Sequence, residues 1–242
     1  MFLKTLAIAG LATFAAAGAA SASTLIHYYG FDDDSVTDTV GSVDGALFGD
    51  AVVEDGFLKL DGQGDYAQLS DHAVPLGSQT VILSFQRLSK PHTYGEIISQ
   101  GSSGNGYYIG YQGSDTFRFG DNHLSTSVAY PADGEFHQFA MVTGPGLSFY
   151  IDGVLVYTSG SVAANTHSGT PTRFGVQFNT GGGSPYVEYV HGNLDYVAIF
   201  EGALTAEEIR AFGSAPAVPL PASLPLLAFG VAGLAALRRR RG

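Results

Sequence analysis

The chain has 242 residues, no cysteine, and 22 acidic against 11 basic side chains. Five of the basic residues lie in the first 22 or last five positions, so the middle holds six basic and all 22 acidic residues, a formal charge of −16. This charge excludes nucleic acid as a partner and favours solubility and divalent cations.

The N-terminal segment, residues 1–22, has the three parts of a secretory signal. Lys4 is followed by an apolar, alanine-rich stretch over 6–20, and Ala20-Ser21-Ala22 forms a small-residue cleavage site. We therefore expect an exported protein whose folded domain spans residues 23–212. About 190 residues can bury a core without disulfides.

Short apolar and β-branched runs separated by Gly, Asp, Asn and Ser predict strands. They cover residues 25–31, 57–60, 66–69, 80–88, 96–99, 107–111, 116–119, 136–143, 147–151 and 194–200. The 33 glycines suit many tight turns. Strands of this length and spacing predict an all-β fold, a two-sheet antiparallel sandwich.

Two local motifs refine this prediction. Asp152-Gly153 indicates a two-residue hairpin turn between 147–151 and 154–157, because both residues tolerate a positive φ. Thr205 and Glu208 have the spacing of a capping box and predict one short helix, with Arg210 in its last turn.

The C-terminus continues as a linker, residues 213–217, and a tail, residues 218–242, with an apolar span over 222–237. At about 1.5 Å per residue this span is about 24 Å long, short of a ~30 Å hydrocarbon core. Two motifs flank this span: the short proline motif Val218, Pro219, Leu220, Pro221, Ala222 and the basic cluster Arg238, Arg239, Arg240, Arg241.

This order of motif, span and arginines resembles the PEP-CTERM type of bacterial sorting tail, in its VPLPA variant. The resemblance implies a transient inner-membrane anchor with the arginines on the cytoplasmic side. It also implies an exosortase-type processing enzyme as partner and release to the cell surface or extracellular matrix. An ordinary single-span tail anchor is the alternative.

A series of motifs spans the body of the chain. They read YYGFD at 28–32, GFLKLDGQGDY at 56–66, GEFHQFA at 134–140, LSFYIDG at 147–153, GNLDYVAIF at 192–200 and LTAEEI at 204–209. The series resembles the LamG-like jelly-roll domains of the concanavalin A-like lectin/glucanase superfamily. Phe136 departs from it, since these domains commonly carry tryptophan there. The resemblance implies two packed sheets and no single function.

Catalytic patterns are missing from the sequence. Glucanases of the superfamily carry Glu-x-Asp-x-(x)-Glu on one strand, so that two carboxyls stand roughly 5 Å apart, and no such pattern occurs. Glu188 stands alone, and the seven histidines have no zinc spacing. We expect no enzymatic activity; a glycoside hydrolase or lyase is the less favoured alternative.

The superfamily resemblance also implies one structural calcium ion, where the first strand ends near the last. Here it points to Asp32, Asp33, Asp34 and Asp195, with carbonyls of the 52–56 turn completing the shell. The alternative is a solvated acidic loop.

Sugar binding needs aromatic faces and polar side chains. Tyr107 and Tyr111 share a face of one predicted strand, and Tyr130, Asn105, Asp121, Gln112 and Asn122 could line the same sheet. The alternative is that the tyrosines fill the core between the sheets. The sequence thus predicts an exported binding module associated with extracellular polysaccharide; a structural or adhesive matrix protein without a ligand site is the main rival.

Overall fold

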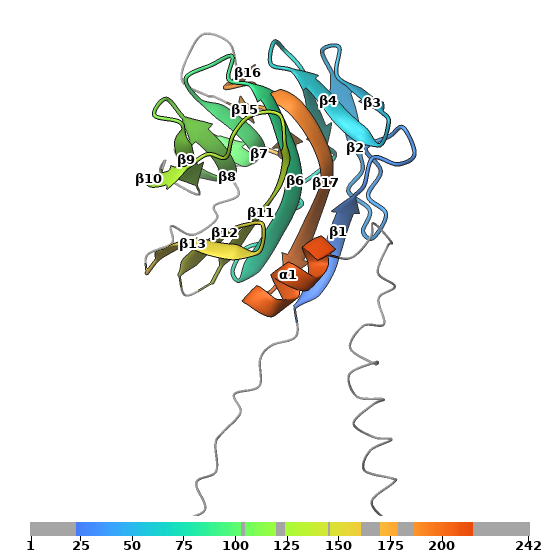
Figure 1. Ribbon diagram of the computed structural model, residues 1–242. Coiled ribbons are helices and arrows are strands. Elements are labelled where there is room, and N and C mark those ends of the chain that lie inside the picture. Colours follow the sequence, from blue (N-terminus) through green and yellow to red (C-terminus); the bar gives the residue numbers. More distant parts are fainter. Residues whose placement is uncertain are drawn as a thin grey trace, which may run out of the picture.

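Two antiparallel β-sheets pack face to face in the computed structural model, and one helix covers part of an outer face (Figure 1). The structure describes residues 23–102, 105–119, 124–144, 146–160, 170–178 and 186–214. The predicted all-β sandwich with one short helix is confirmed. The signal segment, the tail motif and the basic cluster at 238–241 lie outside the described residues. Within the described ranges no helix is long and apolar enough to cross a bilayer.

The first sheet has eight strands in the order β13-β12-β11-β6-β17-β4-β3, with β1 also paired to β17. Long β6 and β17 form its centre and curve together through the molecule (Figure 1). The bounds are β1 Thr24–Tyr29, β3 Val52–Glu54, β4 Phe57–Asp61, β6 Gln79–Ser89, β11 Phe136–Thr143, β12 Leu147–Ile151, β13 Val154–Ser159 and β17 His191–Glu201.

The second sheet has nine strands, seven of them in the order β10-β9-β8-β7-β14-β5-β2, with β15 and β16 attached beside β7. The one parallel pairing among the described strands joins β15 to β7. The bounds are β2 Gly45–Phe48, β5 Tyr66–Leu69, β7 Gly95–Ser102, β8 Asn105–Gln112, β9 Thr116–Phe119, β10 Leu124–Ala129, β14 Thr172–Phe174, β15 Gln177–Phe178 and β16 Tyr186–Val187.

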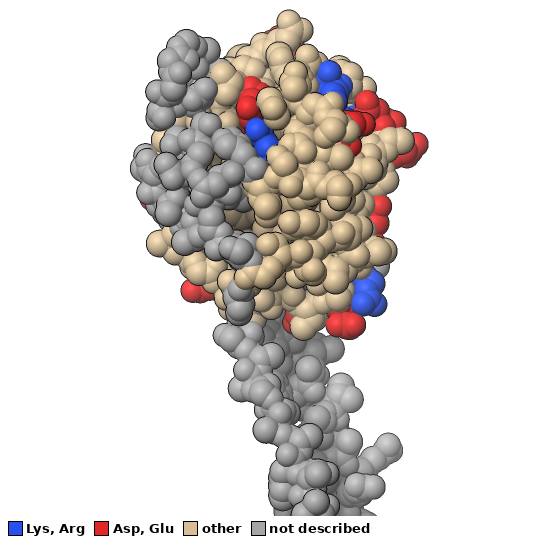
Figure 2. All heavy atoms as spheres, turned by 90° about the vertical axis from the view of Figure 1, so that its left-hand side faces the viewer, with Lys and Arg blue, Asp and Glu red and all other residues tan. Residues whose placement is uncertain are grey.

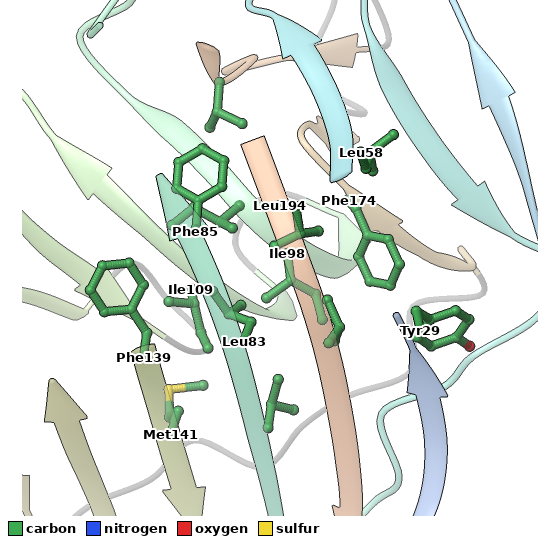
Figure 3. Close-up of a cluster of buried hydrophobic side chains, with 14 of the residues drawn as sticks. Tyr29, Leu58, Leu83, Phe85, Ile98, Ile109, Phe139, Met141, Phe174 and Leu194 are labelled. Atoms are coloured by element: carbon green, nitrogen blue, oxygen red, sulfur yellow. The ribbon is translucent and has the colours of Figure 1, made fainter. Parts of the chain in front are cut away.

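The main core lies between the two sheets, because alternate residues of each strand point inward. On β6 the inward residues are Val81, Leu83 and Phe85, all buried. Figure 3 shows Leu83 and Phe85 among side chains from both sheets, such as Ile98 of β7 and Ile109 of β8. The strand predicted over 80–88 is therefore confirmed, with its alternate residues directed into the core.

The outward face of the first sheet forms a second, smaller core under the helix α1, Ala206–Ser214. Ile82 and Ala198 of the sheet pack there with Ile209 of the helix. The capping box is confirmed, since Thr205 N donates to Glu208 Oε2 at 2.7 Å and Glu208 N to Thr205 Oγ1 at 3.3 Å.

The expected Asp-Gly hairpin turn is also confirmed. Asp152 and Gly153 have φ values of 50° and 72° between β12 and β13, and His137 Nδ1 lies 2.8 Å from Asp152 Oδ2. Gly153 has a second reason to lack a side chain, because a Cβ there would lie 2.4 Å from Arg210 Cγ.

Two predicted boundaries are corrected, and six strands are added. The helix runs to Ser214, into the predicted linker, so Arg210 lies in its middle turn and pairs with Glu207 at 3.2 Å. The connection between the predicted strands 96–99 and 107–111 is shorter than expected, because β7 extends to Ser102 and β8 begins at Asn105. Strands β2, β3, β10, β14, β15 and β16 were not predicted; they are short, and β2 and β10 carry too few buried apolar residues to signal a strand.

Candidate functional site

The residues proposed for calcium lie near one another, as the resemblance implies. Strand β1 pairs with β17, with Tyr29 opposite Val197, so Asp32 just after β1 comes close to Asp195. Burial raises the pKa of Asp195, and the negative charge of Asp32 raises it further, while a hydrogen bond from Ser84 acts against both. Two acidic groups therefore repel each other at this end of the sandwich.

The donor set fits calcium only in part. A Cβ on Gly56 would lie 3.6 Å from Asp32 Oδ1, so this part of the 52–56 segment is near, as expected; residues 52–54 of the expected turn form strand β3 instead. However, Asp33 accepts a hydrogen bond from Ser35 Oγ at 2.7 Å, and Asp34 is exposed with a φ of 56°. Calcium takes six to eight oxygens, and Asp32 and Asp195 supply two carboxylates.

Another acidic group lies elsewhere, at the ends of β4 and β5. Oxygens of Asp50, Asp61 and Asp65 lie within 4.8 Å of one another. Asp65 accepts hydrogen bonds from the backbone N–H groups of Asp50, at 2.8 Å, and Asp61, at 3.2 Å. This carboxylate therefore braces two neighbouring turns, which accounts for its burial.

Replacing Asp195 with asparagine is expected to stabilise the fold at pH 7 without calcium. Because the folded state raises the pKa of Asp195, its contribution is most favourable below the ordinary value of about 3.9 and falls as the pH rises through the folded pKa. Asparagine keeps an acceptor for Ser84 and removes the charge. Urea unfolding at pH 7 and pH 3.5 should show the gain only at pH 7.

The exposed Asp34→Asn variant is the matched control and should change little. The same curves in millimolar calcium test the implied ion: if Asp195 is a ligand, calcium should stabilise the wild type and not Asp195→Asn. A loss of stability in Asp195→Asn without calcium would contradict the repulsion.

The three tyrosines proposed as a sugar platform lie inside the sandwich. Tyr107, Tyr111 and Tyr130 are at most 7% exposed and belong to the core between the sheets. The exposed platform is therefore wrong, and the alternative of core packing holds, because the shared face of β8 points toward the first sheet. Asn105 begins β8, and Gln112 Nε2 donates to Thr116 Oγ1 at 2.9 Å. Asp121 and Asn122 lie outside the described residues.

The opposite face of the same sheet carries an ionic cluster that the sequence did not indicate. Arg118 of β9 donates from one guanidinium nitrogen to both Glu96 of β7 and Glu188, just after β16. Glu96 and Arg118 are buried and Glu188 is mostly buried. The backbone adds a link, since Glu96 N donates to Glu188 O at 2.9 Å.

A glycine makes this cluster possible. Strand β8 runs between β7 and β9, and Gly110 pairs with both Glu96 and Arg118. A Cβ on Gly110 would lie 2.3 Å from Glu96 Oε2, closer than any real contact. The missing side chain therefore leaves the space in which carboxylate and guanidinium meet across the middle strand.

The cluster has one cation for two carboxyls. Burial raises the pKa of Glu96 well above its ordinary value; Arg118 opposes that shift, and the charge of Glu188 adds to it. Burial alone would lower the pKa of the Arg118 guanidinium. The negative charges of Glu96 and Glu188 have the larger combined effect and raise it. Glu96 Oε2 and Arg118 Nε are buried without a hydrogen-bond partner among the described residues.

Two tyrosine rings enclose the guanidinium. Arg118 Cζ lies 4.5 Å from the ring centroid of Tyr94 and 5.3 Å from that of Tyr108. Tyr108 is buried, whereas Tyr94 is 41% exposed. We call Tyr94, Glu96, Tyr108, Arg118 and Glu188 the arginine cluster. It presents one fixed aromatic ring to solvent above a charged, desolvated group.

Sequence reasoning missed this cluster because its members lie 22 and 70 residues apart. Two signals were available locally. Arg118 stands between Phe117 and Phe119, whose side chains both enter the core, so alternation places the arginine on the outer face. Glu188 has a φ of 62°, unusual for glutamate, but the sequence does not show it.

Solved structures with a similar fold include sugar-bound proteins. Domain 4 of AbnA, a GH43 extracellular arabinanase from Geobacillus stearothermophilus in complex with arabinotriose, has a TM-score of 0.66 and 19% identity, covering 79% of this chain and 99% of that one. A botulinum neurotoxin type C structure has a TM-score of 0.63 and 14% identity. Trypanosoma rangeli sialidase in complex with sialic acid has a TM-score of 0.61 and 16% identity. Each match covers 78% of this chain. The matches span 50% of that neurotoxin chain and 32% of the sialidase.

At these identities the structures show a shared fold alone. A search of curated proteins finds no match. The family comparison goes further, because a family model described as the concanavalin A-like lectin/glucanases superfamily matches residues 61–210, more than half of the sequence. The chain belongs to the concanavalin A-like lectin/glucanase superfamily.

Proposed function

We propose that the protein is a non-enzymatic carbohydrate-binding domain whose contact surface includes Tyr94. The observation that carries the proposal is the exposed Tyr94 ring held over the Arg118 guanidinium. Sugar sites combine an aromatic face with a few fixed polar groups, and Glu188 beside Arg118 supplies one. The similar arabinanase domain and sialidase, solved with arabinotriose and sialic acid, support a sugar as ligand.

The alternative of a glycoside hydrolase gains one observation, since Glu96 and Glu188 meet at a single arginine nitrogen. Catalytic carboxyls, however, must flank the scissile bond, one as acid and the other as nucleophile or base. Glu96 is fully buried, and both groups bind the same cation. This arrangement favours a structural task for the pair and supports binding without hydrolysis.

The setting of the domain belongs to the same proposal. A cleaved signal segment over 1–22 and a sorting tail over 218–242, handled by an exosortase-type enzyme, would deliver the domain to the cell surface or matrix. Extracellular polysaccharide is the sugar polymer available there. A matrix protein without a ligand site is the rival, and it predicts no binding to any glycan.

The Tyr94→Ala variant tests the proposed surface. On an array of plant and bacterial polysaccharides, with arabinan and sialylated glycans included, we expect the wild type to bind and the variant to bind about tenfold more weakly, equivalent to about 1.4 kcal/mol. The free energy of unfolding should fall by only about 0.5–1 kcal/mol, because Tyr94 is 41% exposed and its loss removes one cation–π contact with Arg118. Phe136→Ala, an exposed aromatic on the first sheet, is the matched control and should bind as the wild type does.

The outcomes separate the hypotheses. No binding to any glycan would favour the matrix-protein rival. Undiminished binding by Tyr94→Ala would show that Tyr94 is not part of the contact surface, while the proposal of carbohydrate binding would stand. Release of reducing ends by the wild type, lost in Glu188→Gln, would establish the hydrolase alternative.

A further inference from the structure

Uncharged polar side chains form a connected network on the outer face of the second sheet, at β8, β9 and β10. Gln112 Nε2 donates to Thr116 Oγ1 at 2.9 Å, and Ser125 Oγ donates to Gln112 Oε1 at 2.7 Å. The Ser114 and Thr116 hydroxyls lie 2.9 Å apart. Ser114 and Ser125 are exposed, and the other two are half-buried. We call Gln112, Ser114, Thr116 and Ser125 the polar shelf.

The polar shelf lies beside the ring of Tyr94. Ser125 of β10 is the register partner of Arg118, whose Cζ lies 4.5 Å from the centroid of that ring. In the turn between β8 and β9, a Cβ on Gly113 would lie 3.0 Å from Thr93 Cγ2, so the residue before Tyr94 contacts this turn. The ring and the shelf therefore form one contact area on the same face of the sheet.

The groups of the polar shelf suit the hydroxyls of a neutral sugar. A hydroxyl has one donor and two acceptor lone pairs, and an amide oxygen has two lone pairs, so groups already bonded to each other keep capacity for a further bond. Their mutual bonds also hold the side chains in place, which lowers the cost of ordering them when a ligand binds. A sugar carboxylate, in contrast, is held best by a cation.

None of the basic side chains of the folded domain is free to hold an anionic sugar at this surface. Residues 23–214 include six of them, and the structure describes all six. Arg87, Arg118 and Arg173 are at most 4% exposed. The other three pair with acidic groups: Lys59 with Glu54 and Asp55, Lys90 with Asp115, and Arg210 with Glu207.

The charged groups that flank the shelf balance one another. Lys90 Nζ donates to Gly113 O at 3.0 Å and lies 3.8 Å from Asp115 Oδ1. Arg87 Nη1 donates to the same carboxylate oxygen at 2.8 Å, and Arg87 Nε donates to Asp133. Two cations thus face two carboxylates, and an anionic ligand would have to compete with Asp115 for Lys90.

The arginine cluster offers no positive charge either. Arg118 donates to both Glu96 and Glu188, so the cluster has no net positive charge even when Glu96 is protonated. The left side of Figure 1, where β10 lies, faces the viewer in Figure 2, and most of its described surface is uncharged. The folded domain as a whole has six basic and 22 acidic residues. An anionic chain is therefore repelled at long range and finds no unpaired cation on contact.

We propose that the surface formed by Tyr94 and the polar shelf binds a neutral polysaccharide and discriminates against chains that carry carboxylate or sulfate groups. This inference rests on the proposed carbohydrate function and names its class of ligand. The ring stacks on an apolar sugar face, and the shelf exchanges hydrogen bonds with the sugar hydroxyls. Binding of a neutral chain should hardly depend on salt, because no ion pair forms.

Matched pairs of polymers test the charge preference. Polygalacturonate and its full methyl ester share one backbone and differ in the carboxylate charge, and dextran sulfate and dextran differ in the sulfate. On an array of these polymers with arabinan, the full-length wild type should bind neutral members at least about tenfold more tightly than charged ones, because only the charged ones are repelled. Raising the salt from about 50 mM to about 300 mM should leave the neutral signals unchanged.

Three variants test the role of the shelf. Ser125→Lys places a cation there and should cut the preference about tenfold, by strengthening the binding of charged chains. Leu76→Lys adds the same charge at an exposed position close to Val74, whose N–H donates to Gln100 near the opposite end of β7, and should leave the preference unchanged. Ser125→Ala should weaken neutral binding about fivefold at an unchanged melting temperature, because it removes one exposed hydroxyl.

The outcomes distinguish this inference from the function on which it rests. Equal or tighter binding of the charged member of each pair would overturn the neutral preference and leave carbohydrate binding in place. A preference that Ser125→Lys and Leu76→Lys change alike would contradict the role of the shelf. A wild type that binds none of these polymers would overturn both the function and the inference.

Discussion

Replacing Arg118 with methionine is expected to destabilise the domain by about 3–5 kcal/mol at pH 7, the usual cost of removing one partner from a buried ion pair. Methionine keeps much of the stem between the Tyr94 and Tyr108 rings but leaves Glu96 and Glu188 without their cation. Urea unfolding measures the loss. It should shrink at pH 4, because burial raises the pKa of Glu96, so this carboxyl is protonated more readily there and no longer needs its cation.

Two further variants separate charge from geometry. Arg118→Lys keeps the charge but lacks the planar guanidinium that lies between two rings and binds two carboxylates, so we expect an intermediate loss. The triple variant Arg118→Met, Glu96→Gln, Glu188→Gln removes all three charges and should recover much of the stability, since neutral replacements of buried ion clusters are often tolerated. An Arg118→Met protein as stable as the wild type at pH 7 would contradict the cluster's burial.

The elements that the sequence predicts well are those whose signal is local. Strand β6 carries Val81, Leu83 and Phe85 at every second position, so both its existence and its inward face follow from the pattern. Ile82 breaks the alternation, because the outer face of this strand is covered by the second core. The Asp152-Gly153 turn and the Thr205–Glu208 capping box each depend on residues at most three positions apart. These features depend on the backbone conformation and hydrogen bonds of neighbouring residues, and the residue types at those positions are enough to predict them.

The residues of the candidate site are far apart in the chain and meet only in the fold, so a single sequence does not show that they are partners. Glu188 has no acidic neighbour in the chain, and only the register of β7, β8 and β9 places Glu96 and Arg118 on either side of Gly110. Alternation on β8 correctly put Tyr107 and Tyr111 on one face. It could not say which face was inward, because Tyr108 on the other face is buried as well. A strand covered on both sides gives no contrast between its faces.

Tyr111 offers the sharpest test of that assignment. Its ring lies against Gly95, where a Cβ would come within 2.3 Å of it, and it packs edge-on to Tyr130 at 5.7 Å. The Arg87 guanidinium lies 5.1 Å from the ring centroid. Tyr111→Ala would open a cavity among these groups, and truncation of a buried aromatic typically costs about 3–5 kcal/mol. Chemical unfolding of the variant should show a loss of this size.

Tyr111→Phe is the matched control, and the two variants should move in opposite directions. The Tyr111 hydroxyl is buried and finds no hydrogen-bond partner among the described residues, and burial raises its pKa. Removing an unsatisfied buried hydroxyl takes away a desolvation cost, so Tyr111→Phe should be at least as stable as the wild type. Both folded variants should bind glycans as the wild type does, because Tyr94 lies on the other face of the sheet. If Tyr111→Ala kept wild-type stability and lost glycan binding, the ring would be a contact surface and the inward assignment of β8 would be wrong.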